Sequence, residues 1–165
     1  GTESACCLID KYPNVVVCQT VSKAFGLAGI RLGMAFARED IIQLMNNVKA
    51  PYNVNSLTIE VAKKAYGDLT IFEKNKAAIM AERDYLVGLL RKFDKVKKIH
   101  HSDANFVLFE IENSKELYLA MANAGVVCRY RGGEMHCKDC LRVTVGTREE
   151  NDMFMAALTK ECAKF

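Results

Sequence analysis

The 165-residue sequence lacks the features that mark membrane, nucleic-acid-binding and repeat proteins. No apolar run approaches the roughly 20 residues that a membrane-spanning helix needs. No block rich in Lys and Arg occurs, and a net charge of +3 is too small to indicate a nucleic-acid partner. No repeat or low-complexity segment interrupts the chain. We therefore expect neither a membrane nor nucleic acid as a partner, and expect the basic residues to serve small anionic ligands.

The sequence also begins without methionine, and no signal peptide precedes the first expected strand. We therefore expect a processed chain or an excised piece of a longer protein. The seven cysteines are an odd number, and several fall inside expected strands and helices. That usage is typical of cytosolic proteins, in which cysteine acts as a small apolar residue. The expected location is the cytoplasm.

A second Cys-x-x-Cys pair is absent, which weakens the one potential metal motif, His-Cys-Lys-Asp-Cys at residues 136–140. A structural zinc site needs two further ligands at suitable spacing. Cys128 and His136 are the only candidates nearby in the sequence. We predict a polar loop between two strands and no metal site. A non-enzymatic binding module that holds zinc at this loop is the alternative from another functional class.

The most informative stretch is residues 20–33, which contains two hydroxyl side chains, a lysine, three glycines and an arginine. The β-branched run 15–20 predicts a buried strand leading into it, and 30–37 predicts a second strand leaving it. Glycine permits a tight turn, Arg31 suits a phosphate, and Lys23 is a potential nucleophilic amine. From these residues alone, a glycine-rich connection with a surface lysine remains the simpler interpretation.

This stretch, Thr-x-Ser-Lys-Ala-Phe-Gly-Leu-Ala-Gly-x-Arg-x-Gly, resembles the cofactor-lysine segment of fold type I pyridoxal-phosphate aminotransferases. Residues 141–151, Leu-Arg-Val-Thr-Val-Gly-Thr-Arg-Glu-Glu-Asn, resemble the C-terminal signature of the histidinol-phosphate aminotransferases, within the class II aminotransferases. The similarity runs over residues 1–165 without a large gap. It implies an α/β fold made of the C-terminal part of the large-domain sheet and a small α/β C-terminal domain.

The resemblance also implies roles for individual residues around the lysine. Lys23 matches the catalytic lysine that binds pyridoxal 5'-phosphate and moves a proton between substrate and cofactor carbons. Thr20 and Ser22 match hydroxyls that bind the cofactor phosphate. Arg31 matches the arginine that pairs with that phosphate.

Two further arginines match substrate-binding positions of the resembled family. Arg142 matches the arginine that binds the acidic group of the substrate, and Arg129 resembles a second arginine that helps to hold the substrate phosphate. From the residues alone, an edge-strand arginine facing solvent explains Arg142 equally well.

The activity that the resemblance implies for the intact enzyme is transfer of an amino group between L-histidinol phosphate and 2-oxoglutarate or glutamate, in histidine biosynthesis. Family members are homodimers with sites at the interface. The acid and the aromatic ring that contact the cofactor belong to family sequence upstream of this chain, so we expect the 165-residue piece alone to be inactive. An aromatic amino-acid aminotransferase and a threonine-phosphate decarboxylase remain alternatives, because both share much of these motifs.

The order of expected elements divides the chain into three parts. Residues 1–71 are expected to be the C-terminal part of the cofactor-binding large domain, 72–95 a connecting helix, and 96–165 the small C-terminal domain. The apolar periodicity predicts helices and strands: helices over 39–46, 56–66, 71–93, 114–125 and from 147 onward, and strands over 104–111, 126–130 and 141–145. Capping boxes are predicted at Asn113 with Glu116 and at Thr147 with Glu150. The two neighbouring histidines at 100 and 101 are expected to be solvated.

Overall fold

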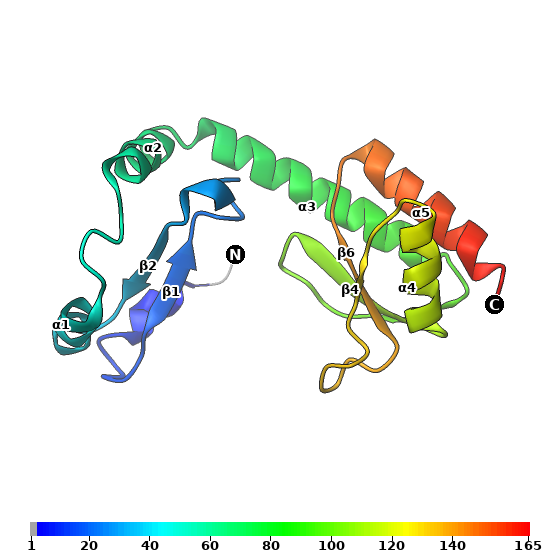
Figure 1. The fold of residues 1–165 in the computed structure, drawn as a ribbon, viewed down its shortest axis with the longest axis horizontal. Coiled ribbons are helices and arrows are strands. Elements are labelled where there is room, and N and C mark those ends of the chain that lie inside the picture. The colour runs from blue at the N-terminus through cyan, green and yellow to red at the C-terminus, as the bar shows by residue number, and fades with distance from the viewer. Residues whose placement is uncertain (1–2) are drawn as a thin grey trace. The chain divides into compact units, whose positions relative to one another are not determined.

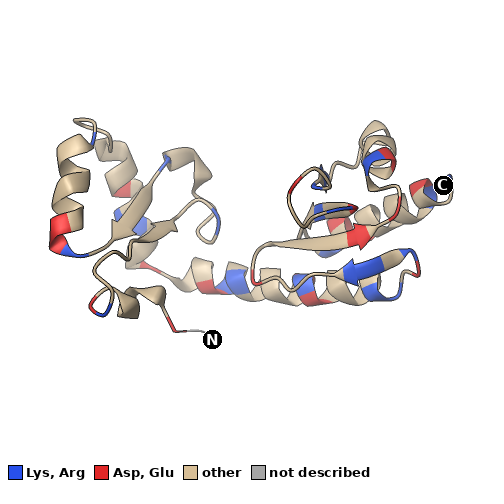
Figure 2. Ribbon diagram, turned by 90° about the horizontal axis from the view of Figure 1, so that it is seen from below, with Lys and Arg blue, Asp and Glu red and all other residues tan. Residues whose placement is uncertain are grey.

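The computed structural model describes residues 3–165, and the chain divides between Lys74 and Asn75 into two compact units. Figure 1 shows the helices and strands of both units. Charged residues of both signs are spread over the elements of each unit (Figure 2). None of the helices in the described part of the chain is long and apolar enough to cross a membrane.

The first unit contains one hairpin of strands and several short helices. Its elements are the 3-10 helix η1 (Ala5–Leu8), strand β1 (Val17–Thr20), the 3-10 helix η2 (Ala28–Ile30), strand β2 (Gly33–Phe36), and helices α1 (Glu39–Val48) and α2 (Ser56–Gly67). β1 and β2 pair antiparallel, with Val17 opposite Phe36 and Thr20 opposite Gly33. Asn55 caps α2, because its side-chain oxygen accepts a hydrogen bond from the backbone N–H of Thr58 at 2.9 Å.

The prediction of a buried first strand was wrong. β1 is shorter than the predicted strand, and its residues Cys18, Gln19 and Thr20 are exposed. Each strand of this sheet has a single neighbour within the described chain, so both outer edges and much of both faces stay accessible. A β-branched, apolar strand of this kind normally packs between other elements.

The second unit is a four-stranded antiparallel sheet covered by helices. Its elements are α3 (Thr70–Arg91, which begins in the first unit), β3 (Val96–Ile99), β4 (Phe106–Ile111), α4 (Ser114–Asn123), β5 (Arg129–Tyr130), β6 (Cys140–Thr144) and α5 (Arg148–Cys162). The strand order is β3-β4-β6-β5. The predicted helix at 71–93 and the predicted strands at 104–111 and 141–145 are confirmed within two residues at each end.

The core of this unit lies between one face of the sheet and the helices. Along β4, Val107, Phe109 and Ile111 are buried, whereas the residues between them are only half-buried. This alternation is what a strand with one covered face requires. The buried side chains that pack together come from three helices and two strands: Leu86, Leu90, Val107, Phe109, Ile111, Leu117, Met121, Leu141, Val143, Phe154 and Leu158. The opposite face of the same sheet carries Glu110 and Arg142.

Local details of the second unit correct two predictions and add a strand that the sequence did not predict. Asn113 has a left-handed backbone (φ 52°) and its side chain makes no cap, so the capping box with Glu116 is wrong. An N-cap residue needs an extended backbone for its side chain to reach the helix N–H groups. Strand β3 was not predicted, because its two adjacent lysines hide the alternation. His100, which follows β3, is half-buried rather than solvated.

The capping box at the start of α5 is confirmed. The Thr147 side chain accepts from Glu150 N at 3.3 Å, and the Glu150 carboxylate accepts from Thr147 N at 2.8 Å. The two residues thus satisfy N–H groups that a helix start leaves unpaired.

Candidate functional site

The segment after β1 brings two of the predicted hydroxyl side chains together. Thr20 Oγ1 lies 2.8 Å from Ser22 Oγ and accepts a hydrogen bond from Ser22 N at 3.1 Å. It also lies 3.2 Å from the carbonyl oxygen of Leu32, on the chain that leads into β2. Between the two hydroxyls, Val21 is fully buried and fixes the segment to the interior. The hydroxyl pair is therefore held at the end of β1 by its own hydrogen bonds.

Lys23 lies at the tip of a closed turn. Its carbonyl oxygen accepts from Gly26 N at 2.9 Å, and Leu27 N donates to the Val21 carbonyl at 3.2 Å. Gly26 has φ +68°, a left-handed conformation that glycine adopts without strain. The Lys23 side chain is exposed, and its amine has no hydrogen-bond or ion-pair partner among residues 3–165. The turn thus presents a free amine one residue from Ser22.

An aromatic cluster holds this turn in place, and the sequence reasoning did not identify it. The ring of Phe25 stacks on Phe72 at 4.6 Å between centroids and contacts Tyr66 at 4.8 Å. Such aromatic contacts contribute about 0.5–1.5 kcal/mol beyond the area they bury. The signal was the single aromatic residue within the glycine-rich stretch, two positions after the lysine. We infer that Phe25 positions the lysine turn against α2 and the first turn of α3.

Arg31 is at the C-terminal end of η2 and does not bond to the hydroxyl pair in this structure. Its backbone is left-handed (φ 53°), and its Nη1 donates to the carbonyl of Ala28 at 3.2 Å. The Thr58 hydroxyl of α2 donates to the carbonyl of Ile30 at 3.2 Å and so ties this turn to α2. The guanidinium is exposed and keeps donors that its single hydrogen bond does not use.

The donor set of this segment fits a phosphorylated aldehyde cofactor. Two hydroxyls and a guanidinium are groups that bind phosphate, and an unpartnered primary amine is the group that reacts with an aldehyde. All of them come from one turn and its flanks, residues 20–31. The structure therefore provides one side of such a site, although the assigned roles remain predictions.

The two predicted substrate arginines lie on neighbouring strands of the second unit. Arg129 of β5 is directly opposite Arg142 of β6, so both side chains project from the same face of the sheet. The Arg142 guanidinium lies 4.9 Å from the centroid of the Phe106 ring, and its Nε is buried with no hydrogen-bond partner among residues 3–165. Like charges directly opposite each other are destabilising in a sheet. The pair is thus suited to bind an anion.

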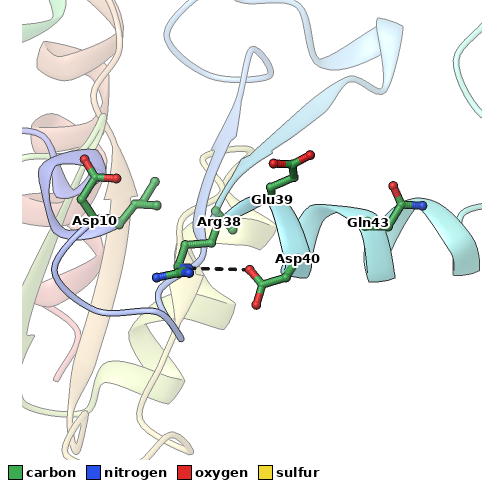
Figure 3. Close-up of a pocket in the computed structure, with 7 residues that line it drawn as sticks. Asp10, Arg38, Glu39, Asp40 and Gln43 are labelled. Carbon is green, nitrogen blue, oxygen red and sulfur yellow. Dashed lines mark ion pairs between the residues drawn. The ribbon is translucent and has the colours of Figure 1, made fainter.

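The pocket of the first unit drawn in Figure 3 lies elsewhere. It has a volume of about 730 Å³ and is lined by polar residues at the start of α1 and by residues of the N-terminal segment. Arg38 and Asp40 form an ion pair across 3.7 Å there. None of the predicted cofactor residues lines this pocket. It supplies no reactive amine and no hydroxyl pair.

The two residues that the sequence offered as further metal ligands, Cys128 and His136, do not lie together with the Cys-x-x-Cys motif. Cys128 is buried in the core of the second unit, and His136 is exposed on the loop. Burial raises the pKa of the Cys128 thiol to about 11. Cys140 instead faces His100 and Glu110, which are distant in sequence.

Comparison with known proteins relates the whole chain to one enzyme family. The family model described as aminotransferase class I and II matches residues 1–158. The histidinol-phosphate aminotransferase of Flavobacterium johnsoniae is 41% identical over 150 residues, which are 91% of this chain and 43% of that protein. The chain thus spans less than half the length of that relative.

Solved structures share the fold. The crystal structure of the histidinol-phosphate aminotransferase from Clostridium acetobutylicum matches with a TM-score of 0.90 and 24% identity, over 97% of this chain and 49% of that one. The enzyme of the same name from Sinorhizobium meliloti, in complex with pyridoxal-5'-phosphate, matches with a TM-score of 0.80 and 22% identity, over 92% and 42% of the two chains. The α/β fold expected from the sequence is therefore confirmed as that of the fold type I enzymes. The chain belongs to the aminotransferase class I and II family, whose members depend on pyridoxal phosphate.

Proposed function

We propose that this chain is the C-terminal portion of a histidinol-phosphate aminotransferase, which transfers an amino group between L-histidinol phosphate and 2-oxoglutarate in histidine biosynthesis. The observation that carries the proposal is the turn after β1, where Lys23, whose amine has no partner among residues 3–165, follows directly on the hydrogen-bonded hydroxyls of Thr20 and Ser22. Its support comes from the family model and from relatives of this name at about 40% identity.

The chain's own residues have distinct tasks in this reaction. Lys23 would hold the cofactor through its amine, and the same amine would move a proton to or from the substrate carbon. The cofactor phosphate would be bound by the hydroxyls of Thr20 and Ser22 and by the guanidinium of Arg31. The charge-assisted hydrogen bonds from Arg31 would be the strongest of these interactions. When bound, pyridoxal phosphate supplies the electron sink for the charge that develops at the substrate carbon.

The substrate phosphate is assigned to Arg129 and Arg142. Two guanidinium groups that project side by side from β5 and β6 repel each other until an anion lies between them. A phosphate that carries close to two negative charges relieves this repulsion better than a single carboxylate does. The buried, unpartnered Nε of Arg142 is a donor available for that purpose.

The remaining parts of the proposal concern the intact protein. We propose a homodimer in the cytoplasm, with small-molecule substrates and no nucleic-acid or membrane partner. The 165-residue chain spans 43% of its relative from Flavobacterium johnsoniae. The resemblance implies that the acid and the aromatic ring that contact the cofactor belong to sequence upstream of it. We therefore expect weak cofactor binding and no turnover from this chain alone.

The test of the site is reductive trapping. The 165-residue chain is incubated with pyridoxal phosphate, reduced with borohydride and mapped by peptide mass analysis. We expect the pyridoxyl adduct on Lys23 and its loss in Lys23→Arg, while Lys49→Arg, which changes another exposed lysine of the first unit, leaves labelling unchanged. An adduct confined to other lysines would refute the assignment.

The test of the substrate uses the intact enzyme that contains this chain. Steady-state rates are compared for histidinol phosphate and phenylalanine as amino donors, and carbon dioxide release is measured with threonine phosphate. Preference for histidinol phosphate supports the proposal. Preference for phenylalanine, or release of carbon dioxide, would replace it with one of the two related activities.

A further inference from the structure

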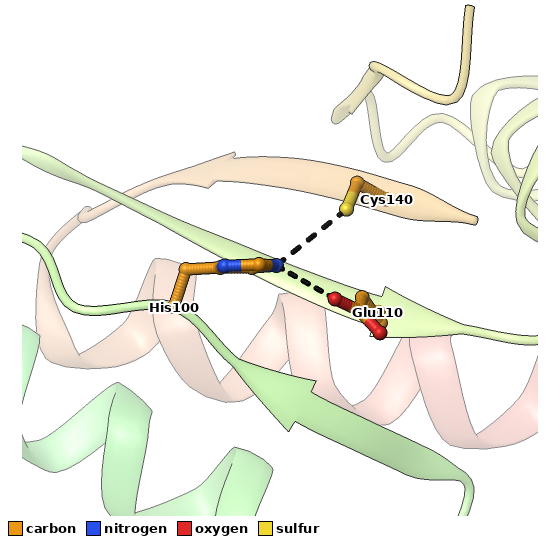
Figure 4. A group of neighbouring side chains, drawn as sticks. All are labelled: His100, Glu110 and Cys140. Atoms are coloured by element: carbon orange, nitrogen blue, oxygen red, sulfur yellow. Dashed lines mark hydrogen bonds and ion pairs between the residues drawn. The ribbon is translucent and has the colours of Figure 1, made fainter. Parts of the chain in front are cut away.

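Three side chains that the proposed reaction does not use converge on the sheet of the second unit. Figure 4 shows that the ring of His100 points toward both Glu110 and Cys140. His100 Nε2 lies 2.9 Å from Glu110 Oε1 and 3.8 Å from Cys140 Sγ. One potential ligand atom from each residue lies within 4.8 Å of the other two. Imidazole, carboxylate and thiolate are the three side-chain groups that bind zinc.

Strand pairing fixes this arrangement. Glu110 of β4 is directly opposite Cys140 of β6, so their side chains leave the sheet on the same face. His100 directly follows β3 and extends its pairing with β4, because the His100 backbone N–H donates to the Leu108 carbonyl at 2.9 Å. The three residues therefore come from three adjacent strands, and their relative positions are set by backbone hydrogen bonds rather than by a flexible loop.

The spacing suits a tetrahedral ion. Zinc bonds of about 2.0–2.3 Å place neighbouring ligand atoms of a tetrahedron about 3.3–3.8 Å apart. The observed 3.8 Å between His100 and Cys140 is at the upper end of this range, and the 2.9 Å between His100 and Glu110 is about half an ångström too short. Cys140 is buried and His100 and Glu110 are half-buried, which limits competition from water.

The Cys137 sulfur is not one of the three ligand atoms that lie within 4.8 Å of one another, so its side chain would have to move to supply a fourth ligand. It precedes Cys140 by three residues, and the Cys140 backbone N–H donates to the Cys137 carbonyl at 3.0 Å. The Cys137 side chain also interacts with the Cys140 thiol. Cys-x-x-Cys is the spacing with which zinc sites commonly supply two sulfur ligands.

An ordinary ion pair is the simpler explanation of part of this cluster. His100 interacts with Glu110, and Lys98 Nζ also lies 3.6 Å from the same carboxylate oxygen. The Cys140 thiol donates a weak hydrogen bond to the Lys138 carbonyl at 3.5 Å, so it has a partner even without a metal ion. Lys98 is mostly exposed, and such a pair contributes little, so a metal ion displaces it at small cost. The ion pair does not account for the position of Cys140.

We propose that His100, Glu110 and Cys140, together with Cys137, bind one divalent metal ion of borderline softness, for which Zn²⁺ is the fitting biological candidate. Four protein ligands leave no open position, so the site is structural rather than catalytic. It would join β3, β4 and β6 to the loop before β6. Arg142 is two residues farther along β6, on the same face, so the ion would stiffen the strand that carries a predicted substrate residue.

Cobalt(II) is the probe for the test, because thiolate coordination gives a charge-transfer band in the near ultraviolet and tetrahedral geometry gives strong visible bands. The chelator-treated 165-residue chain is titrated with Co²⁺ in the presence of a non-thiol reductant, and Zn²⁺ is then added. We expect saturation at one equivalent, a band intensity typical of two thiolates, and displacement by Zn²⁺. Saturation without a thiolate band would overturn the proposal.

Matched variants assign the ligands. Cys140→Ser and Cys137→Ser are each expected to halve the charge-transfer intensity, and Cys18→Ser, which changes an exposed thiol of the first unit, to leave it unchanged. His100→Gln is expected to weaken Co²⁺ binding by more than about tenfold, since even outer-shell substitutions at metal sites cost about 10–100-fold. His101→Gln is its control, because that ring is 86% exposed.

Thermal unfolding separates loss of a ligand from loss of the fold. Zn²⁺ is expected to raise the Tm of the wild-type chain and of His101→Gln, and to raise the Tm of Cys140→Ser by a smaller amount, because that variant loses one ligand. Circular dichroism without metal checks that each variant is folded. Equal affinity of the His100 and His101 variants, or a full band in Cys140→Ser, would overturn the site. A full band in Cys137→Ser would overturn the fourth ligand.

Discussion

Arg148 of α5 and Glu82 of α3 form a two-pronged ion pair. Arg148 Nη2 donates to one carboxylate oxygen at 2.9 Å, and its Nε lies 3.1 Å from the other. The guanidinium also lies 3.6 Å from the centroid of the Tyr85 ring, and the Asn151 amide donates to Glu82 at 3.1 Å. This network joins α5 to α3.

The first prediction concerns the pH dependence of stability. The hydrogen bond from Arg148 is the largest cause that lowers the pKa of Glu82 below its ordinary 4.5. A carboxyl whose pKa is lowered by folding stabilises the protein above its unfolded pKa, and this contribution is lost as the pH falls through the folded pKa. The Tm advantage of wild type over Glu82→Gln should therefore be full at neutral pH and should shrink below about pH 4.5.

Thermal unfolding from pH 7 to pH 3 measures this difference, with Glu149→Gln, an exposed change in the first turn of α5, as the control. A Tm difference between wild type and Glu82→Gln that does not change with pH would contradict the linkage.

The second prediction concerns Asn151, which is 1% exposed. Its amide oxygen accepts from Gly146 N at 3.1 Å, and its amide nitrogen donates to the Gly146 carbonyl at 3.2 Å as well as to Glu82. Asn151→Ala leaves these buried groups without partners, which costs about 1–3 kcal/mol of unfolding free energy. Urea denaturation measures the loss. Met153→Ala, at a side chain 63% exposed, should change it by less than about 0.5 kcal/mol. Equal effects of the two changes would argue against the role of Asn151.

The third prediction concerns the capping box of α5. Thr147→Ala removes the acceptor for Glu150 N, and the loss of such a cap costs about 1 kcal/mol. Thr159→Ala is the matched control, because its hydroxyl only donates to the Met155 carbonyl within the same helix. Chemical denaturation of both variants should place Thr147→Ala clearly below Thr159→Ala in stability. The reverse order would show that the box contributes little.

The elements that the sequence predicted best are those whose signal is local. The helix at 71–93 follows from apolar spacing, and Thr147 with Glu150 follows from a capping pattern, both of which depend on a few neighbouring residues. Strand β3 was missed because Lys97 and Lys98 interrupt its alternation. The capping box predicted at Asn113 was wrong, because the residue pattern does not reveal that the Asn113 backbone is left-handed.

Long-range relationships were harder to predict. The position of Arg129 opposite Arg142 depends on strand register, and the contact of His100 with Cys140 joins residues 40 apart. The sequence predicted a polar loop and no metal site at the Cys-x-x-Cys motif, and the only potential ligands it offered were the sequence neighbours Cys128 and His136. The pairing of β3, β4 and β6 is what brings His100 and Glu110 close to Cys140. The exposure of β1 likewise depends on neighbours that no local pattern reveals.

The last prediction concerns the arginine pair in the intact enzyme. Arg142→Gln removes a charged donor from the proposed phosphate site, and hydrogen bonds to charged groups contribute about 1.5–3 kcal/mol, so kcat/KM for histidinol phosphate should fall about 10–100-fold. Arg131→Gln is the control, because Arg131 lies beyond the end of β5 and pairs with Glu134 at 2.6 Å. Arg142→Gln also removes the repulsion with Arg129, so thermal stability without substrate should not fall with the activity. A parallel loss of stability and activity would mean that Arg142 supports the sheet rather than the substrate.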